Sequence, residues 1–399
     1  MSTVRRLLPI IYYENGPSHN IFIIKNNGKI IYKYKKCGIL KNMYVAKKDE
    51  IWGDIIMGYK LKTLLMKNVI AKKQKDKPFD YIASENYTLD QDADPAVNNS
   101  YYFSAHGTET KESLYCRLGV RSSHSEVWFY YANGTNRYAL KTMLYKENVP
   151  LKVDKSENGW RIEYRGELTR EDNTKAEAEF EGEFTSEAPP VDFFSHMPPI
   201  RTAKAMAGEK WSRQFFDEVQ SNNQVHYEQT GRLCGTLRID GRSIPIDLPC
   251  VRDHSFGKRD WNYMNNHLWL MAVNDTSQLN FSMVSYPAMS VLEVGNYKAA
   301  NKPMAYMTEA TYDRSSVVKG SVPEKLELSL TLNDKSRLHI VAEKTDEERY
   351  LFQGGDYCLI EGVGEFTING EPFRGIIEIG FNREKSRIFN GKDIHSLKV

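Results

Sequence analysis

The chain has 399 residues, 41% hydrophobic and 27% charged, so it is long enough for two domains and is neither disordered nor membrane-spanning throughout. No stretch approaches about 20 uninterrupted apolar residues, and the N-terminus lacks a signal-peptide pattern, so we expect a cytoplasmic protein. Charge is uneven, because residues 1–80 hold 17 Lys and Arg against 6 Asp and Glu, whereas residues 81–399 hold 37 against 46.

The pattern of residues also argues against several classes of site. The five cysteines are scattered and include no Cys-x-x-Cys pair, so neither a disulfide framework nor a zinc site is indicated. Nucleotide-binding glycine loops, a Gly-x-Ser-x-Gly elbow and a His-Glu-x-x-His motif are all missing from the sequence. We therefore expect no metal, no cofactor and no nucleic-acid partner.

Residues 1–90 form a basic N-terminal extension. Residues 21–24 and 30–32 are short apolar runs about Asn27-Gly28, which predicts a hairpin. Residues 56–73 then carry periodic apolar residues with lysines mostly opposite, which predicts a basic amphipathic helix. The apolar positions are Met57, Leu61, Leu64, Leu65 and Val69. Such a helix suits an anionic membrane surface or an acidic partner; the alternative is a helix packed on the body with a solvated lysine face.

From about residue 100 the pattern changes to alternation of period two, which is typical of half-buried antiparallel strands. Residues 175–184 are the clearest case, and turns are expected at Asp240-Gly241 and Asn369-Gly370. Many short strands with such turns, in a chain with 12% aromatic residues, favour tandem antiparallel barrels or sandwiches in a mostly β protein.

A Pro-rich connector at 188–199 separates two strand-rich halves, and a linking helix is predicted over about 202–218. We therefore place a first β domain at 91–200, a linker helix at 201–224 and a second β domain at 225–399. Two echoes suggest duplication of a β unit. Asn98-Asn99 resembles Asn265-Asn266, and Gly-Glu-Phe-Thr occurs both at 182–185 and at 364–367.

The densest group of chemically capable residues is Arg252 to Trp261, at the end of a predicted strand. If the strand continues, Asp253 faces one way while Arg252 and His254 face the other. An arginine would keep a carboxylate ionised, whereas burial without such a partner would make it a proton donor. An Arg–Asp network that braces a loop is the alternative.

A second group, His226 to Gly231, lies on the strand before the Asp240-Gly241 turn. A two-residue turn mirrors the register about its centre, so Glu228 and Gln229 are expected opposite Asp253 and Arg252. A simple Glu–Arg pair is the alternative reading.

Residues with candidate roles follow from these two groups and from the next strands. Proton transfer or its support is assigned to Asp253, His254, Glu228, Arg259 and Asp260. Ligand contact is assigned to Tyr227, Gln229, Arg252, Trp261, His267, Trp269, Met271 and Glu361. His267, Trp269 and Met271 alternate onto one face, where Tyr227 and Trp261 would join them in a mostly apolar pocket. Aromatic residues of this kind are also common in cores.

The string Asp253 to Gly257, followed by Arg259 to Trp261, resembles the calycin-like superfamily of hydroxyneurosporene synthase (the carotenoid 1,2-hydratase), AttH-like proteins and lipocalin-like Diels–Alderases. Strings at 100–103, 126–128 and 227–229 are closer to uncharacterised animal proteins, some labelled phosphoenolpyruvate synthase-like. No phosphotransfer pattern supports that label. The resemblance covers roughly residues 98–380 and implies two lipocalin-like β domains.

The same resemblance implies an apolar ligand, isoprenoid or polyketide-like, bound in or between the domains. It also implies acid-assisted hydration or cyclisation without a metal, with Asp253 as proton donor and with His254 and Arg259 as orienting groups. Phe256 replaces the tryptophan of the hydratase string. We expect a small-molecule-binding protein that is a hydratase-, cyclase- or isomerase-like enzyme, with a lipid carrier or a membrane-peripheral protein as alternatives.

Overall fold

The computed structural model describes residues 11–14, 19–26, 29–36, 39–43, 58–90, 92–221, 224–315, 321–352, 355–383, 388–389 and 392–393. The chain divides into two compact units, one of Met1–Gly58 with Lys210–Val219 and one of Tyr59–Glu209 with Gln220–Val399. No helix in the described ranges is both long and apolar enough to cross a membrane.

The first unit contains a four-stranded antiparallel sheet in the order β1-β2-β3-β4. Its strands are β1 (Ile11–Glu14), β2 (His19–Asn26), β3 (Lys29–Lys36) and β4 (Ile39–Met43). The expected hairpin is therefore present as β2 and β3, although Asn27-Gly28 itself lies outside the described residues.

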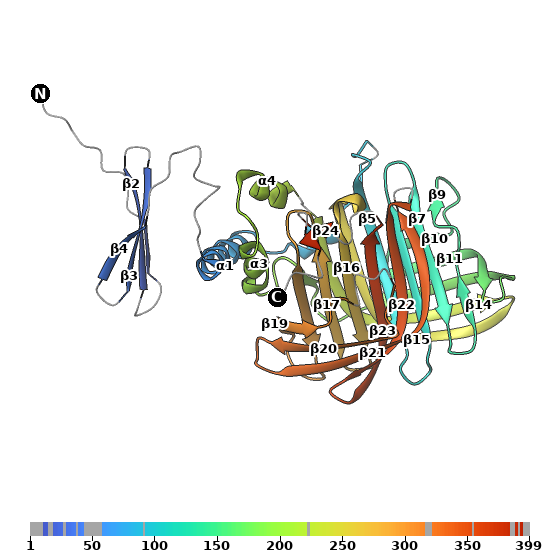
Figure 1. Ribbon diagram of the computed structural model, residues 1–399. Helices are drawn as coiled ribbons and strands as arrows, with labels where there is room; N and C mark the ends of the chain where they lie inside the picture. The colour runs from blue at the N-terminus through green and yellow to red at the C-terminus, as the bar shows by residue number, and fades with distance from the viewer. Residues whose placement is uncertain are drawn as a thin grey trace, which may run out of the picture. The chain divides into compact units, whose positions relative to one another are not determined.

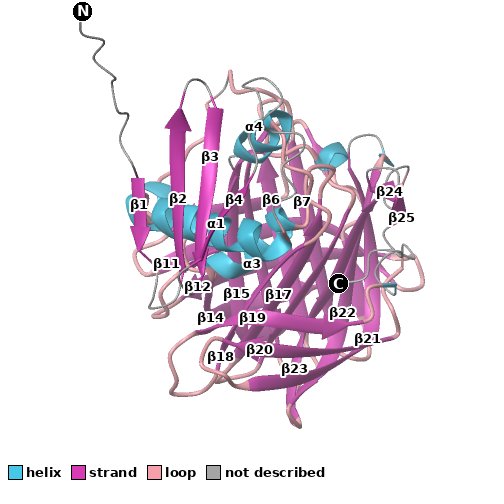
Figure 2. Ribbon diagram, turned by 60° about the vertical axis from the view of Figure 1, so that its left-hand side comes forward, coloured by secondary structure: helices cyan, strands magenta, loops and turns pink. Residues whose placement is uncertain are grey.

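The predicted basic helix is α1 (Tyr59–Asp76), which packs beside α3 (Pro199–Ala207) in the second unit (Figures 1 and 2). Its buried residues are Met66 and Ile70, whereas Leu64 and Val69 are 44% and 47% exposed. The expected apolar face is therefore wrong at those two positions, because the helix meets the body through a narrow strip only. A short helix, α2 (Tyr81–Glu85), follows it.

Eight strands of the second unit close into a first barrel, since β11 pairs with β8 and completes the ring β5-β6-β7-β8-β11-β12-β14-β15. They are β5 (Val97–His106), β6 (Ser113–Val120), β7 (Ser125–Ala132), β8 (Arg137–Ala139), β11 (Gly159–Arg170), β12 (Lys175–Thr185), β14 (Gln224–Ile239) and β15 (Arg242–Lys258). The short strands β9 (Leu144–Tyr145), β10 (Leu151–Lys155) and β13 (Val191–Asp192) pair alongside.

The following strands form a second closed barrel in chain order, with β23 returning to pair with β16 (Figure 1). They are β16 (Asn266–Val273), β17 (Gln278–Ser285), β18 (Leu292–Lys298), β19 (Ala305–Tyr312), β20 (Lys325–Leu332), β21 (Arg337–Phe352), β22 (Tyr357–Ile368) and β23 (Glu371–Asn382). A 3₁₀ turn, Trp261–Tyr263, joins the barrels, and the small pair β24 (Ile388–Phe389) and β25 (Lys392–Asp393) follows. The predicted pair of antiparallel barrels in a mostly β protein is confirmed.

Alternation along the strands divides the buried side chains into three layers. One layer, including Phe103 and Phe129, comes from the first barrel, and another, including Leu268 and Leu270, comes from the second. These two layers fill the barrels, as expected for closely packed side chains. The third layer, including Tyr102 and Trp269, combines outward-facing residues of both barrels. We call this layer between the barrels the seam.

Two expectations about organisation are corrected. The strands over 224–258 pair with β12 and β5, so they complete the first barrel instead of opening the second. The linking helix is two helices, α3 and α4 (Arg213–Ser221). Gly208 caps the end of α3, and the Ser212 hydroxyl accepts from the Phe215 N–H at the start of α4.

The echo at Asn98 and Asn265 does mark equivalent places, the first strand of each barrel. The second echo does not, because 182–185 lies on the sixth strand of one ring and 364–367 on the seventh strand of the other.

Candidate functional site between the barrels

The two motif strands pair in the predicted register. Glu228 lies opposite Asp253, and Gln229 lies opposite Arg252. The turn has positive φ at Asp240 (48°) and Gly241 (76°), the conformation of a two-residue hairpin loop. Because side chains alternate, the motif is divided between two environments.

One half of the motif faces the interior of the first barrel. Arg252 and His254 are fully buried there, with Tyr227 and Gln229 on the neighbouring strand. Arg252 forms an ion pair with Glu85 of α2. Burial, and then the charge of Arg252, lowers the pKa of His254 to about 3, so its imidazole is neutral near pH 7.

The other half faces the seam. His226 Nδ1 lies 2.7 Å from the Ser255 hydroxyl and 3.2 Å from Asp253 Oδ1, while His226 Nε2 lies 3.3 Å from Glu228 Oε1. Asn280 of the second barrel donates to the other Glu228 oxygen. Burial opposes protonation of His226, but the charges of Asp253 and Glu228 outweigh it and raise the pKa of the imidazole. Burial raises the pKa of Glu228.

A second carboxyl pair lies in the seam on the hairpin of β22 and β23. Glu361 and Glu378 are directly opposite each other, and Glu361 Oε2 is buried without a hydrogen-bond partner among the described residues. Burial, and then the charge of Glu378, raises the pKa of Glu361 well above its ordinary value. Burial would also raise the pKa of Glu378, but the hydrogen bond and charge of His267 outweigh it and lower that pKa. These opposite shifts favour a proton on Glu361 over one on Glu378.

Hydrogen bonds extend from this pair in both directions along the seam. On one side, Glu378 Oε1 lies 2.6 Å from His267 Nε2, and His267 Nδ1 lies 2.6 Å from the Tyr357 hydroxyl. On the other side, the Tyr102 hydroxyl donates to Glu361 Oε1. The carboxyl pair is thus tied to both barrels, because Tyr102 belongs to β5 and His267 to β16.

Beyond Tyr102 the contacts continue along the outward face of β5. The Tyr102 and Ser104 hydroxyls are 3.2 Å apart, Ser104 lies 2.7 Å from His106 Nε2, and His106 Nδ1 lies 3.0 Å from the Ser113 hydroxyl. Arg374 Nε donates to Ser113 at 2.8 Å. Burial lowers the pKa of His106 to about 3, so this imidazole is neutral. The contacts therefore run from Glu361 of the second barrel, through Tyr102, Ser104 and His106 of β5, back to Arg374 of the second barrel.

Aromatic rings surround these polar groups. Trp269 lies 5.6 Å from the ring of Tyr102 and 6.2 Å from that of His226, so one indole contacts both halves of the seam. The buried indole N–H groups of Trp128, Trp261 and Trp269 have no hydrogen-bond partner among the described residues. The seam therefore combines apolar walls with unused donors.

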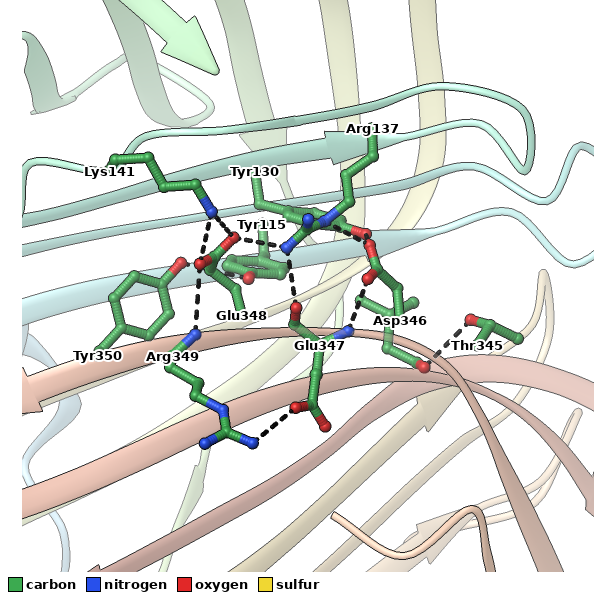
Figure 3. Close-up of polar contacts among 11 residues, drawn as sticks. Tyr115, Tyr130, Arg137, Lys141, Thr345, Asp346, Glu347, Glu348, Arg349 and Tyr350 are labelled. Atoms are coloured by element: carbon green, nitrogen blue, oxygen red, sulfur yellow. Dashed lines mark hydrogen bonds and ion pairs between the residues drawn. The ribbon is translucent and has the colours of Figure 1, made fainter. Parts of the chain in front are cut away.

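A pocket of about 400 Å³ lies at one edge of the seam, between residues 140–144 of the first barrel and 348–351 of β21. Figure 3 shows Arg137 and Lys141 of the first barrel meeting Glu348 of the second, with Tyr350 beside them. The Tyr350 hydroxyl lies 3.2 Å from that of Tyr115. Burial raises the pKa of each of these two tyrosines well above its ordinary value.

Solvent reaches the seam at a few side chains. The His226 and Asp253 side chains are 25% and 11% exposed, and those of Glu378 and His267 are 9% and 7% exposed. Glu361 is fully buried. Of the two carboxyl groups, that of Glu378 therefore lies nearer to solvent.

We compared the chain with known families and structures. Residues 85–383 match the family described as Domain of unknown function (DUF7064). The chain belongs to the DUF7064 family. No curated protein matches the chain.

Three solved structures are similar to the DUF7064 chain. They are kievitone hydratase from Nectria haematococca (12% identity, TM-score 0.45, covering 76% of this chain and 94% of that one), an AttH-like protein from Nitrosomonas europaea (12%, 0.44, 74% and 97%) and CghA with Sch210972 (10%, 0.45, 72% and 88%). Identities this low do not carry a function from one protein to another. The closer similarity to animal proteins stays a prediction.

Within the DUF7064 region the predicted site residues fall into three places. The interior of the first barrel holds Tyr227, Gln229, Arg252 and His254. The seam holds Glu228, Asp253, Arg259, Trp261, His267, Trp269, Met271 and Glu361. Asp260 caps the 3₁₀ turn at 261–263. The expected pocket that joined Tyr227 to Trp269 is therefore wrong, because the two face different layers. Burial, and then the charge of Arg117, lowers the pKa of Arg259 to about 10.

The sequence interpretation of this DUF7064 protein missed Glu378, Tyr102, Tyr357 and His106. Glu378 could have been predicted with the register rule that places Glu228 opposite Asp253. Glu361 lies eight residues before the Asn369-Gly370 turn, and Glu378 lies eight residues after it, so they are mirror partners. Tyr102 and His106 carried no such signal, because their partners come from distant strands.

Proposed function

We propose that this protein catalyses acid–base chemistry on an apolar or amphipathic small molecule at the seam, in the class of hydration, cyclisation or isomerisation. The observation that carries the proposal is the Glu361–Glu378 pair, in which the pKa of one carboxyl group is raised and that of its neighbour lowered. Two carboxyl groups that share one proton supply an acid and a base at adjacent positions.

The two members have different roles. Glu378 has the exposed surface and meets the substrate, while Glu361 holds the shared proton and is oriented by Tyr102. In a hydration, the proton of the pair passes through Glu378 to one carbon of the double bond. A water oxygen bonds to the other carbon, and the proton that this water loses returns to the pair.

The surrounding groups support this assignment. The indoles of Trp128, Trp261 and Trp269 offer flat apolar walls, and their π faces favour positive charge that develops when a carbon is protonated. Asp253, the proton donor expected from the sequence, contacts His226 and Ser255, so in this proposal it orients His226. Arg259 and Trp261 flank the same layer, with 5.0 Å between the guanidinium and the ring.

Solvent deuterium exchange tests the proposal. The purified protein is incubated in D₂O with farnesol, oleate or chalcone, and the products are analysed by mass spectrometry for added deuterium or added water. We expect incorporation with at least one probe and a loss of about 100-fold or more in Glu361→Gln and Glu378→Gln. Glu371→Gln is the matched control, because Glu371 is an exposed residue at the start of β23, in the same hairpin.

Two results would contradict the proposal. Incorporation that persists at the wild-type rate in Glu361→Gln would remove the carboxyl pair from the chemistry. A co-purifying small molecule bound equally well by wild type and Glu361→Gln, with no incorporation in either, would instead favour the carrier alternative.

A further inference from the structure

A polar cluster distinct from the seam lies at one end of the first barrel. Its centre is Arg252, which has no exposed surface. The guanidinium carbon lies 5.1 Å from the centre of the Trp160 ring, 5.4 Å from that of Tyr227 and 6.0 Å from that of Phe184. A cation that is fully removed from water and enclosed by aromatic faces has a strong requirement for an anion.

The anion comes from outside the ring of strands. Glu85 is the last residue of α2, a helix that precedes the first barrel strand. One oxygen of its carboxylate, Oε1, accepts from both Arg252 Nη2 and the Tyr227 hydroxyl. The side chain of a separate helical segment therefore fills the position of a bound carboxylate.

The fit between Glu85 and Arg252 is incomplete. An arginine binds a carboxylate best through two parallel N–H bonds. Here Arg252 uses Nη2 alone, for Glu85 and at 3.3 Å for Gln229 Oε1, while Nε and Nη1 have no hydrogen-bond partner among the described residues. A carboxylate that is free to choose its orientation can satisfy donors that Glu85 leaves unused.

The segment that carries Glu85 is short, and it is held by ring contacts of Phe79 and Tyr81 with Tyr227 and of Tyr87 with Phe256. A helix of five residues has no stability of its own, so α2 is held by its contacts alone. Ile82 on its outer side is 74% exposed, and the Tyr81 hydroxyl reaches Gln229 at 3.4 Å, which is a weak bond. Lys155 holds Asn86 at 2.8 Å just after the helix.

We propose that Arg252, Tyr227 and Gln229 form a binding site for the carboxylate of a small organic acid, and that Glu85 occupies this site in cis until such an acid displaces α2. The neighbouring His254 is neutral near pH 7 and lies 2.7 Å from the Tyr227 hydroxyl, so Tyr227 keeps its orientation when the carboxylate exchanges. The site is separate from the seam and does not depend on the chemistry proposed there.

The test uses hexanoate as probe and hexanamide as its neutral counterpart, with the full-length protein. Calorimetry measures affinity, and hydrogen exchange over residues 77–90 reports whether α2 leaves its position. We expect hexanoate to bind wild type weakly and to increase exchange over 77–90. Glu85→Ala should bind it about tenfold or more tightly, because the competing carboxylate is gone. Arg252→Lys should lose this gain, since lysine cannot form two parallel bonds.

Controls keep the outcome decisive. Glu157→Ala removes an exposed glutamate and should match wild type. If Glu85→Ala does not fold, Glu85→Gln keeps the shape and removes the charge, with the same expectation. Equal affinity of wild type and the Glu85 variant, binding without increased exchange over 77–90, or equal binding of hexanamide would each overturn the proposal and leave Glu85–Arg252 as a structural ion pair.

Discussion

Replacing Glu361 by glutamine tests whether this carboxyl group is protonated in the folded protein. Glutamine has the shape of protonated glutamic acid: its amide can donate to Glu378, and its oxygen can accept from Tyr102. At a pH at which Glu361 is protonated in both the folded and the unfolded chain, its replacement by glutamine should therefore lower the free energy of unfolding by no more than about 1 kcal/mol.

The pH dependence gives the discriminating magnitude. A carboxyl group with a raised folded-state pKa contributes stability that is complete below its unfolded pKa, about 4.3, and is lost as pH rises through the folded pKa. Above the unfolded pKa of about 4.3, the free energy of unfolding of wild type should fall relative to that of Glu361→Gln. The slope should be at most about 1.4 kcal/mol per pH unit. At pH 7 the variant should be the more stable protein, by no more than about 4 kcal/mol.

Urea unfolding at pH 4.5, 5.5, 6.5 and 7.5 measures this difference, with the exposed Glu371→Gln of the same hairpin as the control. Glu378 has a lowered pKa, so its contribution is lost as pH falls below about 4.3, in a separate window. A difference between Glu361→Gln and wild type that does not change with pH would show that Glu361 is ionised in the fold. The acid–base proposal would then lose its basis.

Three further changes probe other parts of the molecule. Although burial opposes it, the neighbouring carboxylates raise the pKa of His226. The stabilisation from His226 is therefore present below about pH 6.5 and is lost at higher pH. In urea unfolding, His226→Gln should lower the free energy of unfolding more at pH 6 than at pH 9. Arg252→Met should lower the free energy of unfolding by about 3–5 kcal/mol, because it leaves Glu85 buried without its partner. The double variant Arg252→Met with Glu85→Met should regain most of this stability in the same assay. A Cβ at Gly375 would lie 1.8 Å from the Met271 carbonyl oxygen, so Gly375→Ala should abolish the cooperative unfolding transition seen by circular dichroism.

The sequence determines the hairpins of this fold well, because their information is local. The Asp240-Gly241 turn set the register of β14 and β15, and alternation then placed Asp253 and Arg252 on opposite faces. Both predictions are confirmed. A two-residue turn leaves no freedom in register, so no knowledge of the rest of the molecule was needed.

The partners of each hairpin could not be predicted in the same way. The Pro-rich segment at 188–199 suggested a domain boundary, yet β15 pairs with β5, about 150 residues earlier in the chain. Pairing over such a distance depends on how the whole ring closes, and short sequence patterns carry no information on it. The same limitation hid the contact of Tyr102 with Glu361, which joins strands of different barrels.

The carboxyl pairs at the seam follow from the way the two rings repeat. Glu228 and Asp253 lie opposite each other on the seventh and eighth strands of the first barrel, and Glu361 and Glu378 do so on the seventh and eighth strands of the second. Equivalent hairpins have thus placed a pair of acids on the shared layer from each side, which favours duplication of one barrel unit. The pairs differ in what surrounds them: His226 contacts both acids of the first pair, whereas in the second pair Tyr102 contacts Glu361 and His267 contacts Glu378. Equivalent positions therefore hold one imidazole between two carboxyl groups on one side and give each carboxyl group its own partner on the other.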